Sequence, residues 1–324
     1  MQIEPVGRLP VTVKRFDNES GMSHVMRAFW GNGMSMRRGF DWLRVRHGKP
    51  LRDVDARVLA WAVQAPPEWM ADRLFLVSAV PNDRGLRLGS RLFSSASLLI
   101  GKPARVCPHC LSEFGFCELT WSFKLAPVCP KHKVFHLGSC LHCRQTISWD
   151  RPQIDICTCG RYLQPASIVS EPPPAVFDWV RWVAVRLAPT SVAWAETGDF
   201  QAVPKILNGL TLDGAFRLVE AFGLLKKPDE PPLVAARTAR SIVGAVGLIV
   251  RGLERLALID GRLHRVRDIA PQIHIAALER LRAHAADTVD SNCATVLLQH
   301  LGDRSDCDVD MRGRHARGQM VLFT

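Results

Sequence analysis

The strongest constraint on this chain lies in a stretch that reads Cys107-Pro-His-Cys110, then, after eighteen residues, Cys129-Pro-Lys-His132, then Cys140-Leu-His-Cys143 and, after thirteen more, Cys157-Thr-Cys159-Gly160. Eight of the ten cysteines fall within it. Close Cys/Cys and Cys/His pairs are typical of structural zinc sites, because both members of a pair reach one ion. Disulfides are disfavoured, since residues 1–20 lack the apolar core of a secretory signal and disulfides do not persist in a reducing cytosol. The stretch therefore predicts zinc binding in a cytoplasmic protein.

The order of the pairs predicts two tetrahedral sites with four ligands each. Neighbouring pairs give a first site of Cys107, Cys110, Cys129 and His132, and a second site of Cys140, Cys143, Cys157 and Cys159. A cross-braced arrangement, in which the two sites exchange pairs, stays open, but both sequential loops have ordinary zinc-ribbon length. Four protein ligands leave no position for a reactive water, so both ions are expected to be structural.

Four further residues of the stretch are potential ligands that we do not assign to a metal. His109 and His142 lie inside Cys pairs, where the local geometry points them away from the ion. Cys117 is expected to be a small buried residue, and His136 a surface imidazole or one that contacts a ligand.

The residues around the ligands carry a resemblance. The motif continues through Leu111-Ser-Glu113, Trp121, Val128 and Leu137, and an earlier segment contains Leu9-Pro10, Asp17-Asn-Glu19-Ser20, Arg27, Asn32-Gly33 and Ser35. In order and spacing these residues resemble the TniQ/TnsD family, over residues 9 to about 165. Only the eight ligands can be carried over to named positions. The resemblance implies no role for Cys117.

This resemblance implies a protein that selects where a transposon inserts. Members of the family either read a DNA site directly or dock on an RNA-guided CRISPR effector complex. They then recruit an AAA+ ATPase that leads to the transposase, and such proteins can act as paired copies. The resemblance therefore implies target DNA or an effector complex, an AAA+ ATPase and, where such proteins pair, a second copy as partners.

The region 1–100 is expected to be helical and similar to a helix-turn-helix. Ser20 can cap a helix that reaches about residue 30, and Ser35 a second that reaches about residue 46. A third helix is expected over 54–63 and a fourth through residues 69–77. The fourth helix contains two acidic residues, Glu68 and Asp72, and only one arginine, Arg73. It is therefore expected to be a poor surface for reading bases.

The rest of the chain divides into a double zinc module at 101–168, a helical domain at 175–301 and a mobile tail at 302–324. Glu171-Pro-Pro-Pro174 marks the boundary after the zinc module. Helices are expected at 176–187, 215–225, 238–258 and 273–284 from their apolar spacing. The predicted fold class is mainly α, with small zinc-ribbon β elements, an N-terminal helical segment and a C-terminal helical bundle.

The charge of the chain favours a polyanionic partner. Lys plus Arg exceed Asp plus Glu by 42 to 31, which gives a net charge of +11 and a pI near 9.5. One candidate nucleic-acid-binding run has Phe40 and Trp42 between its cations, and its residues are Arg37, Arg38, Arg44, Arg46, Lys49 and Arg52. The alternative is that the aromatic residues belong to the core and the charges are merely solvated. A second basic face is possible on the later helices, from Arg237, Arg240, Arg251, Arg255, Arg262, Arg265, Arg267, Arg280 and Arg282.

No catalytic motif is present in the sequence. The P-loop, His-Glu-x-x-His and zinc deaminase patterns are absent. A zinc-braced nuclease is a remote alternative, because it would need His132 and His136 for catalysis while His132 serves as a ligand. The longest uncharged apolar stretch in the C-terminal half, residues 241–250, is too short to cross a membrane.

We therefore predict a non-catalytic targeting adaptor for DNA transposition, which links a CRISPR effector complex to an AAA+ regulator and contains two structural Zn²⁺ ions. The alternatives are a protein that binds a DNA attachment site directly and a zinc-stabilised transcription regulator.

Overall fold

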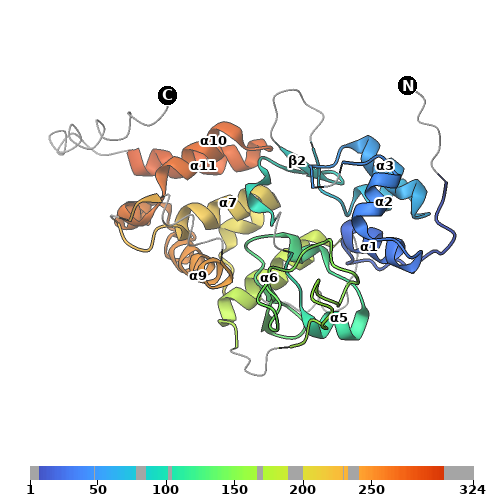
Figure 1. Ribbon diagram of the computed structural model, residues 1–324. Coiled ribbons are helices and arrows are strands. Elements are labelled where there is room, and N and C mark those ends of the chain that lie inside the picture. Colours follow the sequence, from blue (N-terminus) through green and yellow to red (C-terminus); the bar gives the residue numbers. More distant parts are fainter. Residues whose placement is uncertain are drawn as a thin grey trace.

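The computed structural model describes residues 7–46, 48–77, 85–100, 104–165, 171–188, 200–228, 230–232 and 241–302. Within these residues the protein is mainly helical. Figure 1 shows α1 to α3 at one end of the molecule, with α5 below them, and α7, α9, α10 and α11 at the other end, with α6 between the two groups. The expected mobile tail lies outside the described residues, apart from its first residue.

The first part of the chain forms short helices followed by a small antiparallel sheet, in which β2 lies between β1 and β3. Its elements are α1 (Gly21–Gly31), α2 (Met36–Trp42), α3 (Asp53–Ala62), α4 (Pro67–Ala71), β1 (Leu76–Val77), β2 (Leu86–Leu88) and β3 (Arg91–Phe93).

Both predicted serine caps are confirmed. The hydroxyl of Ser20 accepts a hydrogen bond from the Ser23 amide at 3.2 Å, and that of Ser35 accepts one from the Arg38 amide at 3.3 Å. Each satisfies a backbone N–H that has no partner inside its helix. The start of these helices is therefore encoded locally.

Helix α2 ends at Trp42, four residues before the predicted end. Arg44 adopts a left-handed conformation (φ 55°), and the Val45 amide donates to the Phe40 carbonyl at 2.9 Å. This is a Schellman termination, a motif that usually has glycine at the left-handed position. Gly33 ends α1 in the same way, as expected from Asn32-Gly33. Because the left-handed residue that ends α2 is an arginine and not a glycine, the sequence does not indicate that the helix ends here.

The expected fourth helix through residue 77 is wrong, because α4 ends at Ala71 and residues 76–77 form β1. The carbonyl of Arg73 accepts from the Gly21 amide at 2.8 Å, and the Val77 amide donates to Leu51 at 2.7 Å. These tertiary hydrogen bonds take the place of the i to i−4 bonds that a longer helix would need. The helix-turn-helix interpretation stays a prediction.

The middle part contains little regular structure. Its elements are η1 (Ala96–Leu98), α5 (Pro108–Phe114), η2 (Leu119–Ser122), β4 (Val128–Cys129) and β5 (Val134–Phe135). Strands β4 and β5 pair antiparallel, which gives the small β element expected of a zinc ribbon.

The last part is helical, as predicted, and includes a final helix that we did not predict separately. Its elements are α6 (Pro174–Leu187), η3 (Lys205–Gly209), α7 (Leu212–Gly223), α9 (Ile242–Ile259), η4 (Leu263–Gln272), α10 (Ile275–His284) and α11 (Thr288–Gly302). Helices α7 and α9 approach closely, because a Cβ on Gly223 would lie 2.0 Å from the Leu248 carbonyl oxygen and one on Gly252 would lie 2.6 Å from that of Val219. Glycine at both positions allows the two backbones to touch.

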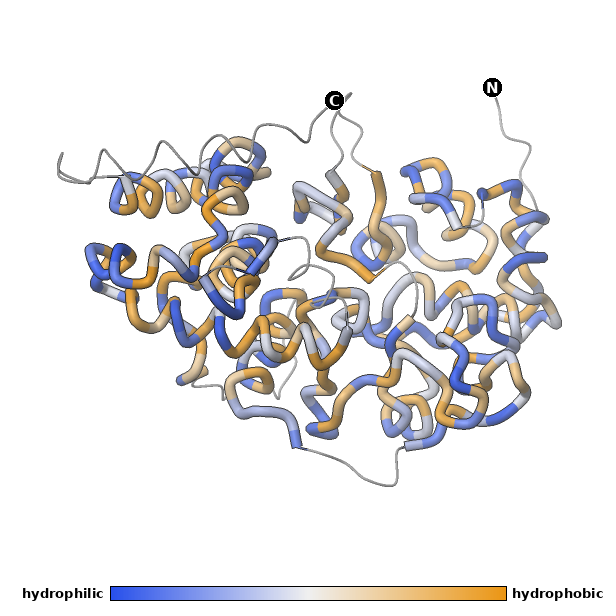
Figure 2. Tube along the Cα trace, turned by 60° about the vertical axis from the view of Figure 1, so that its left-hand side comes forward, coloured by the Kyte–Doolittle hydropathy of each residue, from blue (hydrophilic) through white to orange (hydrophobic). Residues whose placement is uncertain are grey.

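The hydrophobic core does not follow the expected domain bounds. The largest buried cluster joins Leu86, Phe93 and Phe123 to α6, α7 and α9, and the rings of Phe123 and Phe216 stack at 4.9 Å. Separate clusters lie beneath the N-terminal helices and among the cysteines. Figure 2 shows the apolar and polar residues alternating along the helices. The domain bounds stay a prediction, but the core of the last helices extends into residues 86–128.

None of the helices in the described ranges is long and apolar enough to span a membrane.

Candidate metal centres and basic surface

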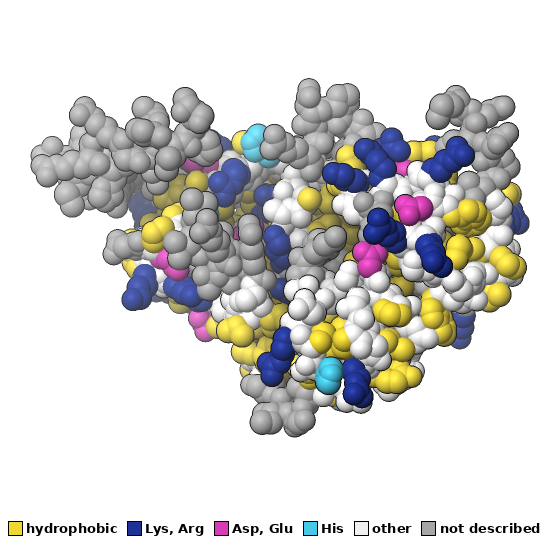
Figure 3. All heavy atoms as spheres, in the orientation of Figure 1, with side chains coloured by type: hydrophobic (Ala, Val, Ile, Leu, Met, Phe, Trp, Pro, Cys, Tyr) yellow, Lys and Arg dark blue, Asp and Glu magenta, His cyan; other side chains and the backbone are white. Residues whose placement is uncertain are grey.

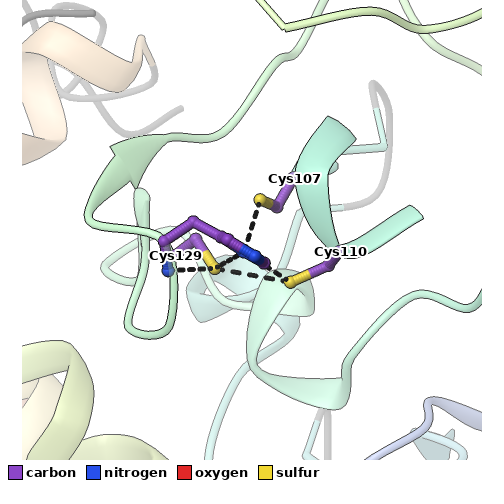
Figure 4. A group of neighbouring side chains, drawn as sticks. Cys107, Cys110 and Cys129 are labelled. Atoms are coloured by element: carbon purple, nitrogen blue, oxygen red, sulfur yellow. Dashed lines mark hydrogen bonds between the residues drawn. The ribbon is translucent and has the colours of Figure 1, made fainter. Parts of the chain in front are cut away.

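The first group of cysteines converges where α5 begins and β4 ends. Cys107 immediately precedes α5 and Cys110 lies in its first turn, while Cys129 ends β4 and His132 follows in the turn to β5. Figure 4 shows the side chains of Cys107, Cys110 and Cys129 pointing toward one another. The Cys110 and Cys129 sulfurs are 3.5 Å apart, and His132 Nδ1 lies 3.6, 3.2 and 3.5 Å from the sulfurs of Cys107, Cys110 and Cys129.

These distances fit one tetrahedral ion. With Zn–S bonds of about 2.3 Å and Zn–N bonds of about 2.0 Å, tetrahedral ligand atoms lie about 3.5–3.8 Å apart. The pKa of Cys107 falls to about 4, because the thiols of Cys110 and Cys129 hydrogen-bond to its sulfur. The donor set and its spacing are those of a closed structural metal site.

A carboxylate orients the histidine ligand. The oxygen Oε2 of Glu113 lies 2.9 Å from Nε2 of His132, on the side of the ring opposite Nδ1. This contact fixes the ring so that Nδ1 faces the three sulfurs, an arrangement common among metal-binding histidines. Sequence reasoning gave Glu113 no role, although an acid one turn after Cys110 on α5 is a possible signal.

The second group lies on loops. Cys140 and Cys159 have sulfurs 3.9 Å apart, and those of Cys143 and Cys157 are 3.7 Å apart. All four ligand atoms lie within 4.8 Å of one another, as they do in the first group. The structure thus groups the eight residues in sequence order and not by cross-bracing. The two clusters are compatible with two structural metal ions.

Left-handed residues close the tight turns of the metal pairs. Lys133 follows His132 with φ 52°, Arg144 follows Cys143 with φ 62°, and Gly160 follows Cys159 with φ 80°. Only the glycine of these could be predicted from the sequence to take a positive φ.

The unassigned residues lie outside both clusters. Cys117 is buried as expected, its pKa is raised to about 11 by burial, and Arg151 donates to its sulfur at 3.4 Å. His136 is only 2% exposed and packs on Trp121, so a surface position for it is wrong. Burial lowers the pKa of His136, while the nearby Cys129 acts in the opposite direction.

His109 and His142 also lie outside the two groups. The His109 ring stacks on that of His132 with centroids 5.2 Å apart. His142 is exposed. Neither position conflicts with the prediction that these side chains point away from a metal.

A buried polar network ties the first metal cluster to α1, and the sequence did not predict it. Glu19, which is fully buried, accepts from Arg27 at 2.9 and 3.0 Å and from the Ser23 hydroxyl at 2.9 Å. Glu118 forms an ion pair of 2.7 Å with Lys131, which lies between two ligands in sequence. Burial raises the pKa of Glu118, and the pairing with Lys131 opposes that change.

Backbone hydrogen bonds join the same two segments. Glu19 and Glu118 form an antiparallel bridge, the Ser20 amide donates to the Cys117 carbonyl at 2.9 Å, and the Leu119 amide donates to the Asn18 carbonyl at 2.9 Å. The metal cluster and the N-terminal helices are therefore mechanically connected.

All six cations of the candidate nucleic-acid-binding run are exposed, namely Arg37, Arg38, Arg44, Arg46, Lys49 and Arg52. Phe40 belongs to the core, whereas Trp42 remains 37% exposed. Arg52 pairs with Asp55 at 3.1 Å, which leaves less of its charge for a partner. Figure 3 shows Lys and Arg side chains gathered over the N-terminal helices.

The later arginines do not form one free basic face. Arg255 is buried and donates to the carbonyls of Phe222, Leu225 and Gln272 at 2.6–2.9 Å. Arg251 donates to the Gly223 carbonyl at 3.0 Å. These two arginines stabilise the end of α7, so the hypothesis of a second phosphate-binding face is wrong for them. Arg237 and Arg240 lie outside the described residues.

Arg267 also has an internal partner. Its Nε donates to the His300 carbonyl at 2.7 Å, which ties η4 to the end of α11. Sequence reasoning missed this role because the two residues are 33 positions apart.

The fold is mainly helical, and its two clusters of potential ligands are compatible with two structural metal ions. The TniQ family model matches residues 10–135, a range that contains the N-terminal helices, the sheet and the first cluster. This match confirms the resemblance noted from the motifs over residues 10–135, so the chain contains a region similar to the TniQ domain. A TniQ domain is typical of transposition-associated targeting proteins. The second cluster and the last helices lie beyond the matched range, and no curated protein matches the chain.

Proposed function

We propose that this protein is a non-catalytic adaptor for transposon targeting, and that it links an RNA-guided CRISPR effector complex to an AAA+ transposition regulator. Two structural Zn²⁺ ions would be held by Cys107, Cys110, Cys129 and His132, and by Cys140, Cys143, Cys157 and Cys159. The ions brace the fold, and the protein contributes binding surfaces.

One observation favours the adaptor over a protein that reads a DNA sequence itself. Helix α4, which follows the turn after α3, has five residues, and Glu68 lies in its first turn. A helix that reads bases in the major groove needs length and donors such as Arg, Asn or Gln on its exposed face. The exposed cations lie instead on α2 and the segment that follows it, where they suit phosphates.

The proposal is tested by identifying the molecules that copurify with the protein. We expect a tagged protein, purified from cells that express its native operon, to carry effector subunits and a guide RNA, which sequencing and mass spectrometry would identify. Recovery of a single DNA locus without RNA would instead show that the protein reads its site directly.

Reversal of two cations tests the basic run. We expect Arg44→Glu with Arg46→Glu to weaken binding to a 30-base-pair duplex of arbitrary sequence by about tenfold at 0.1 M salt. The salt slope of the affinity should fall by about 0.9 for each phosphate that the protein no longer neutralises. Fluorescence anisotropy over a salt series measures both quantities.

The matched control is Arg280→Glu with Arg282→Glu, which makes the same change in net charge at two exposed residues of α10. An equal loss in both variants would show that the effect does not belong to the basic run in particular. An unchanged salt slope in Arg44→Glu with Arg46→Glu would show that the cations of the run are solvated and do not contact phosphates.

A further inference from the structure

A pocket of about 580 Å³ lies where the N-terminal helices meet the sheet and the metal-binding loops. Its apolar wall includes Met22, Phe75, Leu99, Ile100 and Trp149, and each of these side chains is only partly buried. Apolar surface that faces a cavity of this size is typical of a ligand site. Nothing in the proposed adaptor role uses this pocket.

One residue that lines the pocket is a buried arginine. This residue, Arg73, is 6% exposed, with its guanidinium 4.5 Å from the ring centre of Trp69. Its terminal nitrogens donate to the carbonyls of Asp17 at 2.8 Å and Trp69 at 3.3 Å, and its Nε has no hydrogen-bond partner among the residues described. A buried guanidinium with an unmet N–H favours a ligand that brings acceptor atoms.

One wall of the pocket is a continuation of the basic run. Residues 48–51 line the pocket, and they lie between Arg46 and Arg52 in sequence. Lys49 is exposed at this wall. A nucleic-acid backbone held by the run would therefore pass the mouth of the pocket.

We propose that this pocket receives one unpaired nucleobase of the nucleic acid bound by the basic run. The base would lie against Trp149, its acceptor edge would face Arg73, and Lys49 would contact the flanking phosphate. Bases stack on aromatic side chains whatever their identity, and arginine is a common partner of base acceptors. The inference rests on the proposed nucleic-acid contact and adds the form of nucleic acid that is preferred.

An apolar peptide side chain fits the pocket less well. It would cover the aliphatic wall, but it would bring no acceptor to Arg73 and no negative charge to Lys49. A nucleotide has an aromatic ring, acceptors and a phosphate, which match the aromatic wall, Arg73 and Lys49. Asp150 also lines the pocket, so the phosphate would have to lie on the side of Lys49.

Binding of two DNA probes to the full chain tests the inference. One probe is a 30-base-pair duplex, and the other is the same duplex with a single bulged 2-aminopurine. Because stacking contributes about 1–3 kcal/mol per base, we expect the bulged probe to bind about tenfold more tightly or better. We also expect its fluorescence to change on binding as the base inserts.

Three variants locate the effect. Trp149→Leu should abolish the preference for the bulge while leaving affinity for the paired duplex intact. Ser122→Phe should do the same by filling the pocket, without removing a core side chain. Trp42→Leu alters an exposed tryptophan of the basic run outside the pocket lining, and it should keep the preference.

Equal affinity of the wild type for the two probes overturns the base pocket and leaves the proposed phosphate contact standing. A preference that survives Ser122→Phe overturns it too, because the base would then bind elsewhere. Failure of both probes to bind at low salt overturns the nucleic-acid contact itself, and with it this inference.

Discussion

Replacement of Cys110 by serine is expected to remove one metal ion and to unfold the segment that surrounds the first cluster. Structural zinc contributes about 10–16 kcal/mol to folding in zinc-finger peptides, which is comparable to the whole stability of a domain, about 5–15 kcal/mol. Metal analysis of the purified protein should give two ions in the wild type and one in the variant. Thermal unfolding should move to a much lower temperature.

Cys117→Ser is the matched control, because Cys117 is as buried as Cys110 but lies outside the cluster. It should keep both ions and lose only about 1–3 kcal/mol, the usual effect of a single core substitution. Two ions in Cys110→Ser, or thermal stability that does not change when a chelator removes the metal, would contradict a structural metal at this position.

The second large effect is expected for Glu19→Gln. This change leaves Arg27 without its carboxylate at 2.9 Å and weakens the acceptor of Ser23 in a fully buried position. Removal of one partner of a fully buried ion pair costs about 3–5 kcal/mol. Arg27 is 17% exposed and also donates to the Lys14 carbonyl, so we expect a loss of about 2–3 kcal/mol. Chemical denaturation measures the loss as a lower midpoint with an unchanged slope.

Asp268→Asn provides the comparison, since Asp268 is 66% exposed and its distance to Arg265 is 3.6 Å. A surface pair of this kind contributes about 0–1 kcal/mol. Similar losses in the two variants would mean that the Glu19 network is not the connection between the helices and the metal module that the geometry indicates.

The sequence predicted those parts of the protein that depend on neighbours in the chain. Spacing identified the eight ligands, because both members of a close pair can reach one ion, and it favoured grouping in sequence order. The structure was needed to exclude the cross-braced alternative. Ser20 and Ser35 correctly predicted the starts of the helices that they cap. Helix α7 likewise has a local cap, because the side chain of Thr211 accepts from the Gly214 amide.

The parts that the sequence did not reveal depend on partners far away. The bridge between Glu19 and Glu118 joins residues about a hundred positions apart, and no local sequence pattern predicts that they pair. The role of Arg255 could not be predicted from the sequence, because its hydrogen-bond partners are the carbonyls of Phe222 and Leu225, at least 30 positions earlier. The end of α2 was missed for a different reason, because Arg44 takes a backbone conformation that sequence rules reserve for glycine.

The shared packing also limits how the protein can be divided for experiments. A cut between residues 100 and 104 would separate Glu19 from Glu118, and it would also separate the strand residues Leu86 and Phe93 from the helical core that they complete. Fragments made at that boundary would expose apolar surface on both sides. Loss of binding by such a fragment would then report misfolding and not the location of a partner site, so point substitutions are the sounder way to map this protein.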